Sequence, residues 1–296
     1  DAAPAYPTLV STAGDAVIGW GALSGLTVDP QDPARFYAVS DSVFGGAPAI
    51  HALDSSTVPA TITAKTIVMR DGQPAGKLDL EGIAADGQGG FWLASEGDAE
   101  NGIPHAVLQV DAQGNILREI GLPDSLAGAA TRFGFEGVTL ADGGALWLAV
   151  QREWKDDPEG QAKLLRLDPA SGEWSAVRYP LESGEGWVGL SEIAAHDGWL
   201  YVVERDNLIG DKAALKQITR VSLDGLTPAP LGAELPVVAK EVVRDLIPDL
   251  KRLNGYVLDK VEGMAIAADG RVHLVTDNDG TDDSSGETLY WSDMLN

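Results

Sequence analysis

One phrase recurs five times along the chain and constrains its fold more than any other feature. The copies begin at Leu23, Leu80, Phe135, Leu190 and Val261 and read LSGLTVDPQDPARFYAVSD, LEGIAADGQGGFWLASEGD, FEGVTLADGGALWLAVQRE, LSEIAAHDGWLYVVERDN and VEGMAIAADGRVHLVTDND. Each copy predicts two strands and a turn, because the turns hold Asp-Gly and Gly-Gly pairs that accept positive φ. A strand pair repeated at a fixed spacing is typical of propeller blades.

The second residue of each copy, called the anchor below, measures the period. The anchors are Ser24, Glu81, Glu136, Ser191 and Glu262, with successive separations of 57, 55, 55 and 71 residues. Further hairpins around Gly114 and Gly172 complete four strands in two of the repeats. From Glu262 to the end of the sequence and from its start to Ser24 there are together 58 residues, one more period.

These counts predict an all-β fold, a five-bladed β-propeller formed by residues 1–296 as a single domain. The C-terminal TLYWS strand and an N-terminal strand, TLVST or AVIGW, would close the ring within one blade. The long interval holds about 16 extra residues near KEVVRDLIPDLKRLNGYVLDK, whose spacing favours a short helix beside the fourth blade. A sixth blade is the alternative.

Charge and composition exclude several classes of function. The chain carries 45 acidic and 21 basic residues, a net charge of -24, which repels nucleic acids and anionic lipid surfaces. It has no apolar run of about 18 residues, so no membrane insertion is expected. The absence of cysteine excludes disulfides and thiol chemistry. The opening Asp1-Ala2-Ala3-Pro4-Ala5 resembles the start left after signal peptide removal, which indicates a periplasmic or extracellular protein.

The anchors predict a metal site in the channel. Each stands at the head of an innermost strand, so two Ser and three Glu side chains should face one another across the axis. Two carboxylates about 5 Å apart repel by roughly 3 kcal/mol at an effective dielectric near 20. Oxygen atoms converging from five segments suit Ca²⁺, with Mg²⁺ or another hard cation as an alternative. Protonation of the acids, or hydrogen bonding between blades alone, would also account for the ring.

A second ring is expected where the second strand of each copy ends, at Asp41, Glu96, Gln151, Glu204 and Asp277. Antiparallel pairing places these residues at the same mouth as the anchors. Arg152 and Arg205 stand close by and could hold an anionic substrate, or only form salt bridges with adjacent acids. Asp277, Asp279, Asp282 and Asp283 resemble part of a calcium loop and otherwise form a solvated acidic loop.

Several of these phrases together resemble the phytase-like domain family, described by its esterase-like activity of phytase. The resemblance rests on LSGL with VSDS, LDLEGIA with ASEGD, RFGFEGV, LSEI with VVERDN, and VEGMA with TDND. It implies phosphomonoester hydrolysis. The chain has Arg132 where an Asn is usual, and Gln151 where an acid is common. The order of anchors is also similar to the channel calcium ring of five-bladed calcium-activated nucleotidases, which implies all five anchors as ligands.

The sequence therefore predicts a secreted, calcium-dependent, phytase-like hydrolase acting on a small phosphoester at the propeller mouth. Glu96 or Glu204 would serve as the general base, and Arg152 or Arg205 would bind the phosphate beside Asp41, Gln151 and Asp277. Without a Ser or Cys nucleophile motif, direct attack by water is favoured. The alternative is a non-catalytic propeller that binds a ligand or protein and uses channel Ca²⁺ only for stability.

Overall fold

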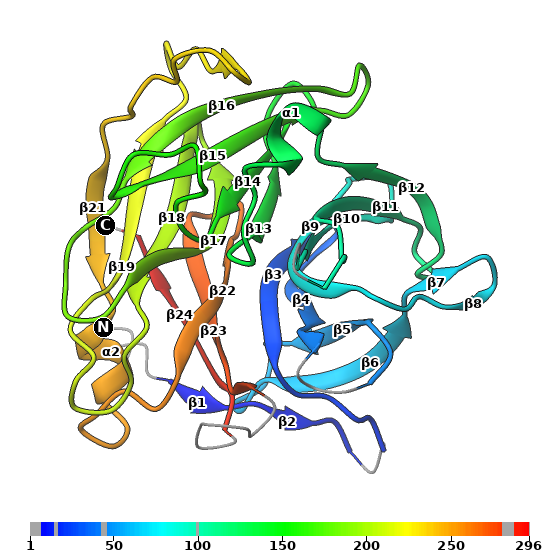
Figure 1. The fold of residues 1–296 in the computed structure, drawn as a ribbon. Helices are drawn as coiled ribbons and strands as arrows, with labels where there is room; N and C mark the ends of the chain where they lie inside the picture. The colour runs from blue at the N-terminus through cyan, green and yellow to red at the C-terminus, as the bar shows by residue number, and fades with distance from the viewer. Residues whose placement is uncertain (1–6, 15–16, 43–45, 99–100, 280–286, 296) are drawn as a thin grey trace.

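Five sheets surround a common axis and form a five-bladed β-propeller (Figure 1). The computed structural model describes residues 7–14, 17–42, 46–98, 101–279 and 287–295. The innermost strands are β3 (Leu23–Asp29), β9 (Asp79–Ala85), β13 (Phe135–Leu140), β17 (Val188–His196) and β22 (Lys260–Ile266). Each of these strands contacts the next, and β22 contacts β3, so the ring is closed. The predicted fold class and blade number are confirmed.

Each blade continues outward from its innermost strand. Blade one adds β4 (Asp32–Ser40), β5 (Ala49–Asp54), β6 (Thr61–Ile67) and β2 (Ser11–Thr12), and blade two adds β10 (Phe91–Glu96), β11 (Ala106–Val110) and β12 (Ile116–Gly121). Blade three adds β14 (Leu146–Val150), β15 (Gln161–Asp168), β16 (Glu173–Pro180) and β20 (Ala229–Pro230). Blade four adds β18 (Trp199–Asp206), β19 (Lys216–Ser222) and β21 (Glu241–Asp245), and blade five adds β23 (Arg271–Asp277), β24 (Leu289–Met294) and β1 (Thr8–Leu9).

Three smaller elements lie between the blades. The strands β7 (Met69–Arg70) and β8 (Gln73–Pro74) pair with each other between blades one and two, and α1 (Asp124–Ala127) precedes blade three. Where the sequence predicts a helix from Val242 onward, the chain first forms β21 and only then α2 (Ile247–Lys251). Pro248 stands in the first turn of α2, where its missing N–H costs no hydrogen bond.

Neither helix of the described chain is long and apolar enough to cross a membrane.

The N-terminal segment closes the ring by pairing with two blades. Thr8 lies opposite Tyr290 in an antiparallel pair between β1 and β24, so the TLVST strand completes blade five. Directly afterwards, Ser11 lies opposite Thr61 in a parallel pair between β2 and β6, the outer strand of blade one. The AVIGW alternative lies partly outside the described residues, and Val17–Trp20 form no strand. One short segment therefore joins the last blade to the first.

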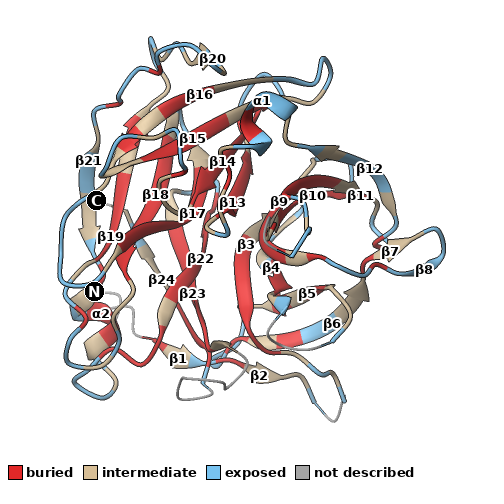
Figure 2. Ribbon diagram, viewed as in Figure 1, coloured by how far each residue is buried: buried red, intermediate tan, exposed pale blue. Residues whose placement is uncertain are grey.

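The hydrophobic core is divided among the five interfaces between neighbouring blades. The cluster between blades two and three contains Trp92 and Phe135, and that between blades three and four contains Trp147. Phe36 and Tyr290 belong to the cluster between blades one and five. Figure 2 shows the inner strands buried along most of their length. Burying this apolar surface fixes each blade against its two neighbours.

A β-bulge occurs in the innermost strand pair of every blade. In blades two, four and five the extra residues are the anchors Glu81, Ser191 and Glu262, and in blade three Glu136 lies in the shifted segment. In blade one the shift follows Ser24. A bulge leaves one residue outside the ladder and redirects its side chain. This recurring distortion is what aims the anchors at the channel.

Glycines directly after four of the anchors allow the inner strands to approach closely. A Cβ atom on Gly82 would lie 2.7 Å from the Glu136 carbonyl oxygen, and one on Gly25, at φ +63°, would lie 2.9 Å from the Glu81 carbonyl oxygen. These distances are shorter than Cβ contacts in proteins, so a side chain at either position would force the backbones apart.

Blade four has Glu192 at the equivalent position, and its side chain extends across the channel. Its Oε2 accepts hydrogen bonds from the backbone N–H groups of Leu26 at 3.1 Å and Met264 at 3.4 Å, on two other blades. Its Oε1 accepts one from Ile193 at 2.9 Å. Burial raises the pKa of Glu192 well above its ordinary value. The carboxyl group therefore fills the space at the axis that the glycines leave empty.

Gly137→Ala tests this packing. A Cβ atom at this position would lie 2.2 Å from Oε1 of Glu192 and 2.5 Å from the backbone nitrogen of Ile193. Because this overlap involves backbone, we expect the free energy of unfolding, measured by urea denaturation, to fall by about 1–3 kcal/mol. Gly128→Ala is the matched control, since Gly128 has helical φ and no atom within 4 Å of a new Cβ. Equal stability of the two variants would contradict the proposed packing.

Candidate functional site

A cavity of about 380 Å³ opens at one mouth of the channel and is lined mostly by ionisable side chains. Most of them occupy three repeated positions: the anchor, the residue two before it, and the residue paired with that one on the second strand. The cavity is lined at these positions by Glu81, Glu136 and Glu262, by Asp79 and Lys260, and by Asp41, Glu96, Gln151, Arg205 and Asp277. The mouth predicted from the repeats is therefore present.

The strand register places Arg205, rather than Glu204, in the second ring. Asp79 pairs with Glu96 and Lys260 pairs with Asp277, so each ring residue lies opposite the position two before its anchor. In blade four that position is Gly189, which pairs with Arg205. Since successive side chains on a strand face opposite sides, the offset of one residue turns Glu204 away from the cavity.

Glu204 is fully buried between blades three and four. Its carboxylate accepts hydrogen bonds from Tyr179 at 3.0 Å and from Gln217 at 3.0 Å, and Lys240 Nζ lies 2.8 Å from its Oε2. The prediction of Glu204 as a base at the mouth is corrected by this placement, because the group is committed to a structural ion pair.

The five anchors are not equivalent. Glu81, Glu136 and Glu262 line the cavity, whereas Ser24 and Ser191 are fully buried and are absent from its wall. The hydroxyl of Ser24 donates to Glu81 Oε2 at 2.7 Å, and that of Ser191 donates to the Val261 carbonyl at 2.7 Å. Both serines thus tie neighbouring blades together and support the glutamates.

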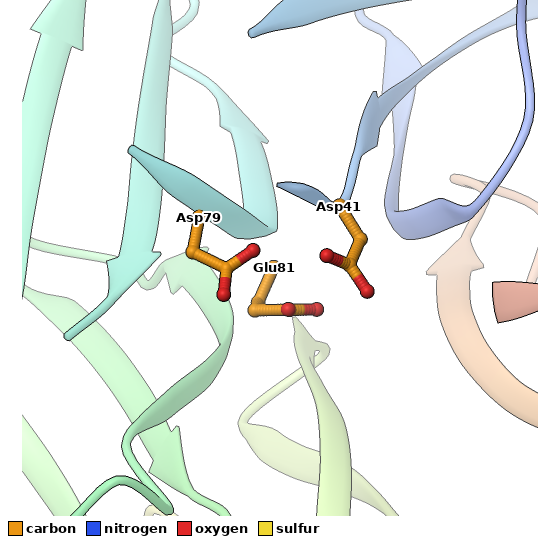
Figure 3. A group of neighbouring side chains, drawn as sticks. All are labelled: Asp41, Asp79 and Glu81. Atoms are coloured by element: carbon orange, nitrogen blue, oxygen red, sulfur yellow. The ribbon is translucent and has the colours of Figure 1, made fainter. Parts of the chain in front are cut away.

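The oxygen atoms that can share a cation lie to one side of the axis. Carboxylate oxygens of Asp41, Asp79 and Glu81 lie within 4.8 Å of one another, and Figure 3 shows the three groups turned toward a common point. Three carboxylates form a hard donor set that fits Ca²⁺ or Mg²⁺. The carboxylates of Glu81, Glu136 and Glu262 form no such group among the described residues. The candidate cation group therefore lies toward blades one and two, whereas the sequence predicts a site formed by the five anchors on the axis.

A second carboxylate group consists of Asp41, Asp277 and Asp279. Here Lys260 supplies positive charge, since its Nζ lies 2.6 Å from Asp279 and 4.0 Å from Asp277. The positive charge of Lys260 lowers the attraction of this second group for a bound cation. Asp282 and Asp283, the rest of the suggested calcium loop, lie outside the described residues.

Burial and mutual repulsion raise the pKa values of several cavity acids. The pKa of Glu81 is well above its ordinary value because of burial and then the charges of Asp41 and Glu136. Burial raises the pKa of Glu96 to about 8, although its Oε1 accepts a hydrogen bond from the Gly134 N–H at 2.6 Å, which acts in the opposite direction. A bound cation would relieve this repulsion.

The side of the cavity formed by blades four and five carries positive charge. One Nη atom of Arg205 donates to Glu262, and although burial acts in the opposite direction, Arg205 and Lys260 hold the pKa of Glu262 below its ordinary value. Arg205 is 2% exposed, and its Nε and Nη1 have no hydrogen-bond partner in the part of the chain that the structure describes. Buried donors without partners are rare, so these two atoms are suited to an anionic ligand.

Two predicted substrate contacts have different surroundings. Gln151 lines the cavity and its amide donates to Glu136. Arg152 lies in an adjoining recess, with its Nε 3.5 Å from Glu153 Oε2. Asp79 is not among the candidate ligands predicted from the sequence. It stands two residues before an anchor, as Lys260 does, and this shared spacing was the available signal.

The fold and site together define a five-bladed propeller with an acidic and basic cavity at one channel mouth. The family model described as "Phytase-like: Esterase-like activity of phytase" matches residues 18–280, and the chain belongs to this family. None of the curated proteins compared with the chain matches it.

Two solved structures are similar to this chain at low sequence identity. An exo-β-1,3-galactanase from Phanerochaete chrysosporium, solved with galactose, is 10% identical with a TM-score of 0.57, covering 96% of this chain and 62% of that one. A luciferin-regenerating enzyme is 14% identical with a TM-score of 0.48, covering 94% of this chain and 79% of that one. At such identities the likeness concerns the fold alone.

Asp41→Asn tests the cation group. Removing one of its negative charges should weaken Ca²⁺ binding, measured by calorimetric titration of chelator-treated protein, by about tenfold or more. Asp142→Asn is the control, since Asp142 is an exposed turn residue before β14. Unchanged affinity in Asp41→Asn would place the cation elsewhere.

The stabilisation by Ca²⁺ should depend on pH. In the cation-free protein the pKa of Glu96 is about 8 and that of Glu81 is raised well above its ordinary value by burial, so cation binding competes with proton binding. We expect the increase in Tm on adding Ca²⁺ to be larger at about pH 8 than at about pH 6. Thermal melts with and without chelator measure it, and equal increases would argue against coupling to these acids.

Proposed function

We propose that this protein is a Ca²⁺-dependent hydrolase of small phosphoesters, which acts at the cavity in the channel mouth. Its membership of the phytase-like family supports hydrolysis as the class of reaction. The observation that carries the proposal is the division of the cavity. Asp41, Asp79 and Glu81 offer a cation site on one side, and Arg205 offers unpaired donors on the other. A phosphoester brought in with a cation has the complementary charges.

The donors of Arg205 suit the phosphoryl group. A guanidinium presents several N–H groups in a fixed plane that matches phosphate oxygens, and burial strengthens each bond by excluding water. Lys260, also in the cavity wall, adds a second positive charge, and its pKa is raised by Glu262 and Asp277 despite burial, so it stays protonated. Together they would orient the ester and offset the charge of its phosphate.

Glu96 is the proposed general base. It lines the cavity opposite Asp79, and its pKa of about 8 makes its carboxylate more basic than an ordinary one, with the proton-accepting form increasing as the pH rises toward 8. The water oxygen would form a bond to phosphorus while the bond from phosphorus to the ester oxygen breaks. The water proton passes to Glu96, and the leaving alcohol takes a proton from solvent. A bound cation would polarise a phosphoryl oxygen.

A location outside the cytoplasm is part of this proposal. Extracellular calcium modules bind with dissociation constants of about 10⁻⁴–10⁻³ M, because free Ca²⁺ is plentiful there. A three-carboxylate group in which burial raises the pKa of Glu81 would suit the same conditions. The Ca²⁺ affinity measured for the parent protein tests this part, since binding in the range of cytosolic buffers would oppose it.

Chelation and Glu96→Gln test the activity. Against a panel of phosphomonoesters, nucleotides and simple esters, we expect chelator to abolish turnover and Ca²⁺ to restore it. Glu96→Gln keeps the acceptor for Gly134 but removes the base, so kcat should fall about 10²–10⁴-fold. Glu234→Gln, at an exposed loop position, is the control. Full turnover in chelator would refute the cation's role, and no turnover with any ester would leave a propeller that only binds its ligand.

A further inference from the structure

A second recess adjoins the cavity and differs from it in charge. It has a volume of about 360 Å³ and is called the basic recess below. It is lined by Ala130, Thr131, Arg132, Phe133, Arg152, Glu153 and Lys155. Three basic residues thus surround one acidic residue, in a chain with only 21 basic residues and a net charge of -24. Such a concentration of positive charge favours an anionic ligand.

The basic side chains of the recess are only weakly neutralised. Arg132 and Lys155 are exposed and form no ion pair with any described residue. Arg152 is paired only with Glu153, at 3.5 Å, and its Nε makes no hydrogen bond within the described ranges. The recess therefore keeps positive charge and free donors, whereas most buried basic groups of this protein, such as Lys163 and Lys216, are paired with aspartates.

Two aromatic rings connect the recess to the cavity. The guanidinium carbon of Arg152 lies 5.2 Å from the centroid of Phe133 and 5.3 Å from that of Trp187, and both rings line the cavity. Arg205, inside the cavity, lies 5.5 Å from the same Trp187 ring. Because both distances are measured to the Trp187 ring, the two guanidinium carbons can be no more than about 11 Å apart. One small molecule can reach both.

Trp187 is held in place by backbone contacts. The backbone N–H of Trp187 donates to the side-chain oxygen of Asn207 at 3.0 Å. The backbone carbonyl of Trp187 accepts a hydrogen bond from the backbone N–H of Asn207 at 3.0 Å. The ring is also packed against Gly189, where a Cβ would lie 3.0 Å from its edge. These contacts fix the backbone of Trp187 and one edge of its ring, and the guanidinium groups of Arg152 and Arg205 both lie close to that ring.

We propose that the basic recess binds a second anionic group, a phosphate or a carboxylate, on the same substrate molecule whose phosphoester is held at Arg205. This inference rests on the proposed function and narrows its substrate class to small molecules with two anionic groups. The shared walls at Arg132 and Phe133 favour one bridging substrate over a free anion that binds by itself. Lys155 lines the recess but not the cavity, so it adds selectivity for the second anionic group.

Direct binding of unreactive probes tests the inference without relying on turnover. Propylphosphonate carries one anionic group, and a series of α,ω-alkane diphosphonates carries two at increasing separation. With Ca²⁺ present, calorimetry on the parent protein should show one diphosphonate binding at least about fivefold tighter than propylphosphonate. Lys155→Glu should abolish this difference and leave propylphosphonate affinity unchanged within about twofold, while Lys155→Arg should preserve it.

Arg118→Glu is the matched control for the change in net charge. Arg118 is an exposed residue of β12, on the outer strand of blade two, so the total charge changes equally without touching the recess. The inference is overturned if propylphosphonate and every diphosphonate bind the parent equally, if Lys155→Glu keeps the difference, or if Arg118→Glu abolishes it as well.

The outcomes separate this inference from the proposed function. A Lys155-dependent preference for a diphosphonate, in a protein that hydrolyses no ester, would support the recess and refute the hydrolase. Hydrolysis of esters with one anionic group, with no advantage for the diphosphonates, would refute the recess and leave the hydrolase. Binding of neither probe would overturn the recess and the anion site at Arg205 together.

Discussion

The close approach of five strands around one axis is the constraint on which the rest of the structure depends. Apart from Glu192, the chain places glycine after each anchor, so the backbones of neighbouring inner strands come almost into contact. No ordinary side chain fits at that level, and Glu192 fits because its carboxylate satisfies three backbone N–H groups. The polar side chains of the repeats are therefore confined to the mouth above this level, where bulges turn them inward.

This arrangement brings many charged side chains together at the mouth and places acidic and basic ones on different sides of it. Every blade contributes to the cavity at one or more of the three repeated positions, and different residues occupy them. Blades one and two supply acids, while blades four and five add Arg205 and Lys260. A symmetric ring of carboxylates would only repel itself. The asymmetric occupation instead gives one cavity an acidic side suited to a cation and a side with basic groups suited to an anion, which is the arrangement that the proposed substrate and its counterion require.

The repeat made the fold predictable and left the site only partly so. Five recurring strand pairs with Gly-rich turns fix the blade number, and the same recurrence locates Glu81, Glu96, Glu136, Gln151, Glu262, Asp41 and Asp277 at the mouth. The error at Glu204 is a shift of one residue along β18, because the register pairs Gly189 with Arg205. The choice of Asp41, Asp79 and Glu81 as neighbours depends on where side chains turn in space, and spacing cannot supply that. Glu192 was visible only as a departure from the glycine pattern.

The segment that joins β1 to β2 has a consequence for how the chain is made. Blade five needs β24, close to the C-terminal end of the sequence, and β1, close to its beginning, while β2 holds the adjacent blade. During synthesis β1 cannot pair until β24 has been made. The early blades therefore emerge from the ribosome with one side uncovered. The cavity, which draws residues from all five blades, becomes complete only after blade five has been synthesised.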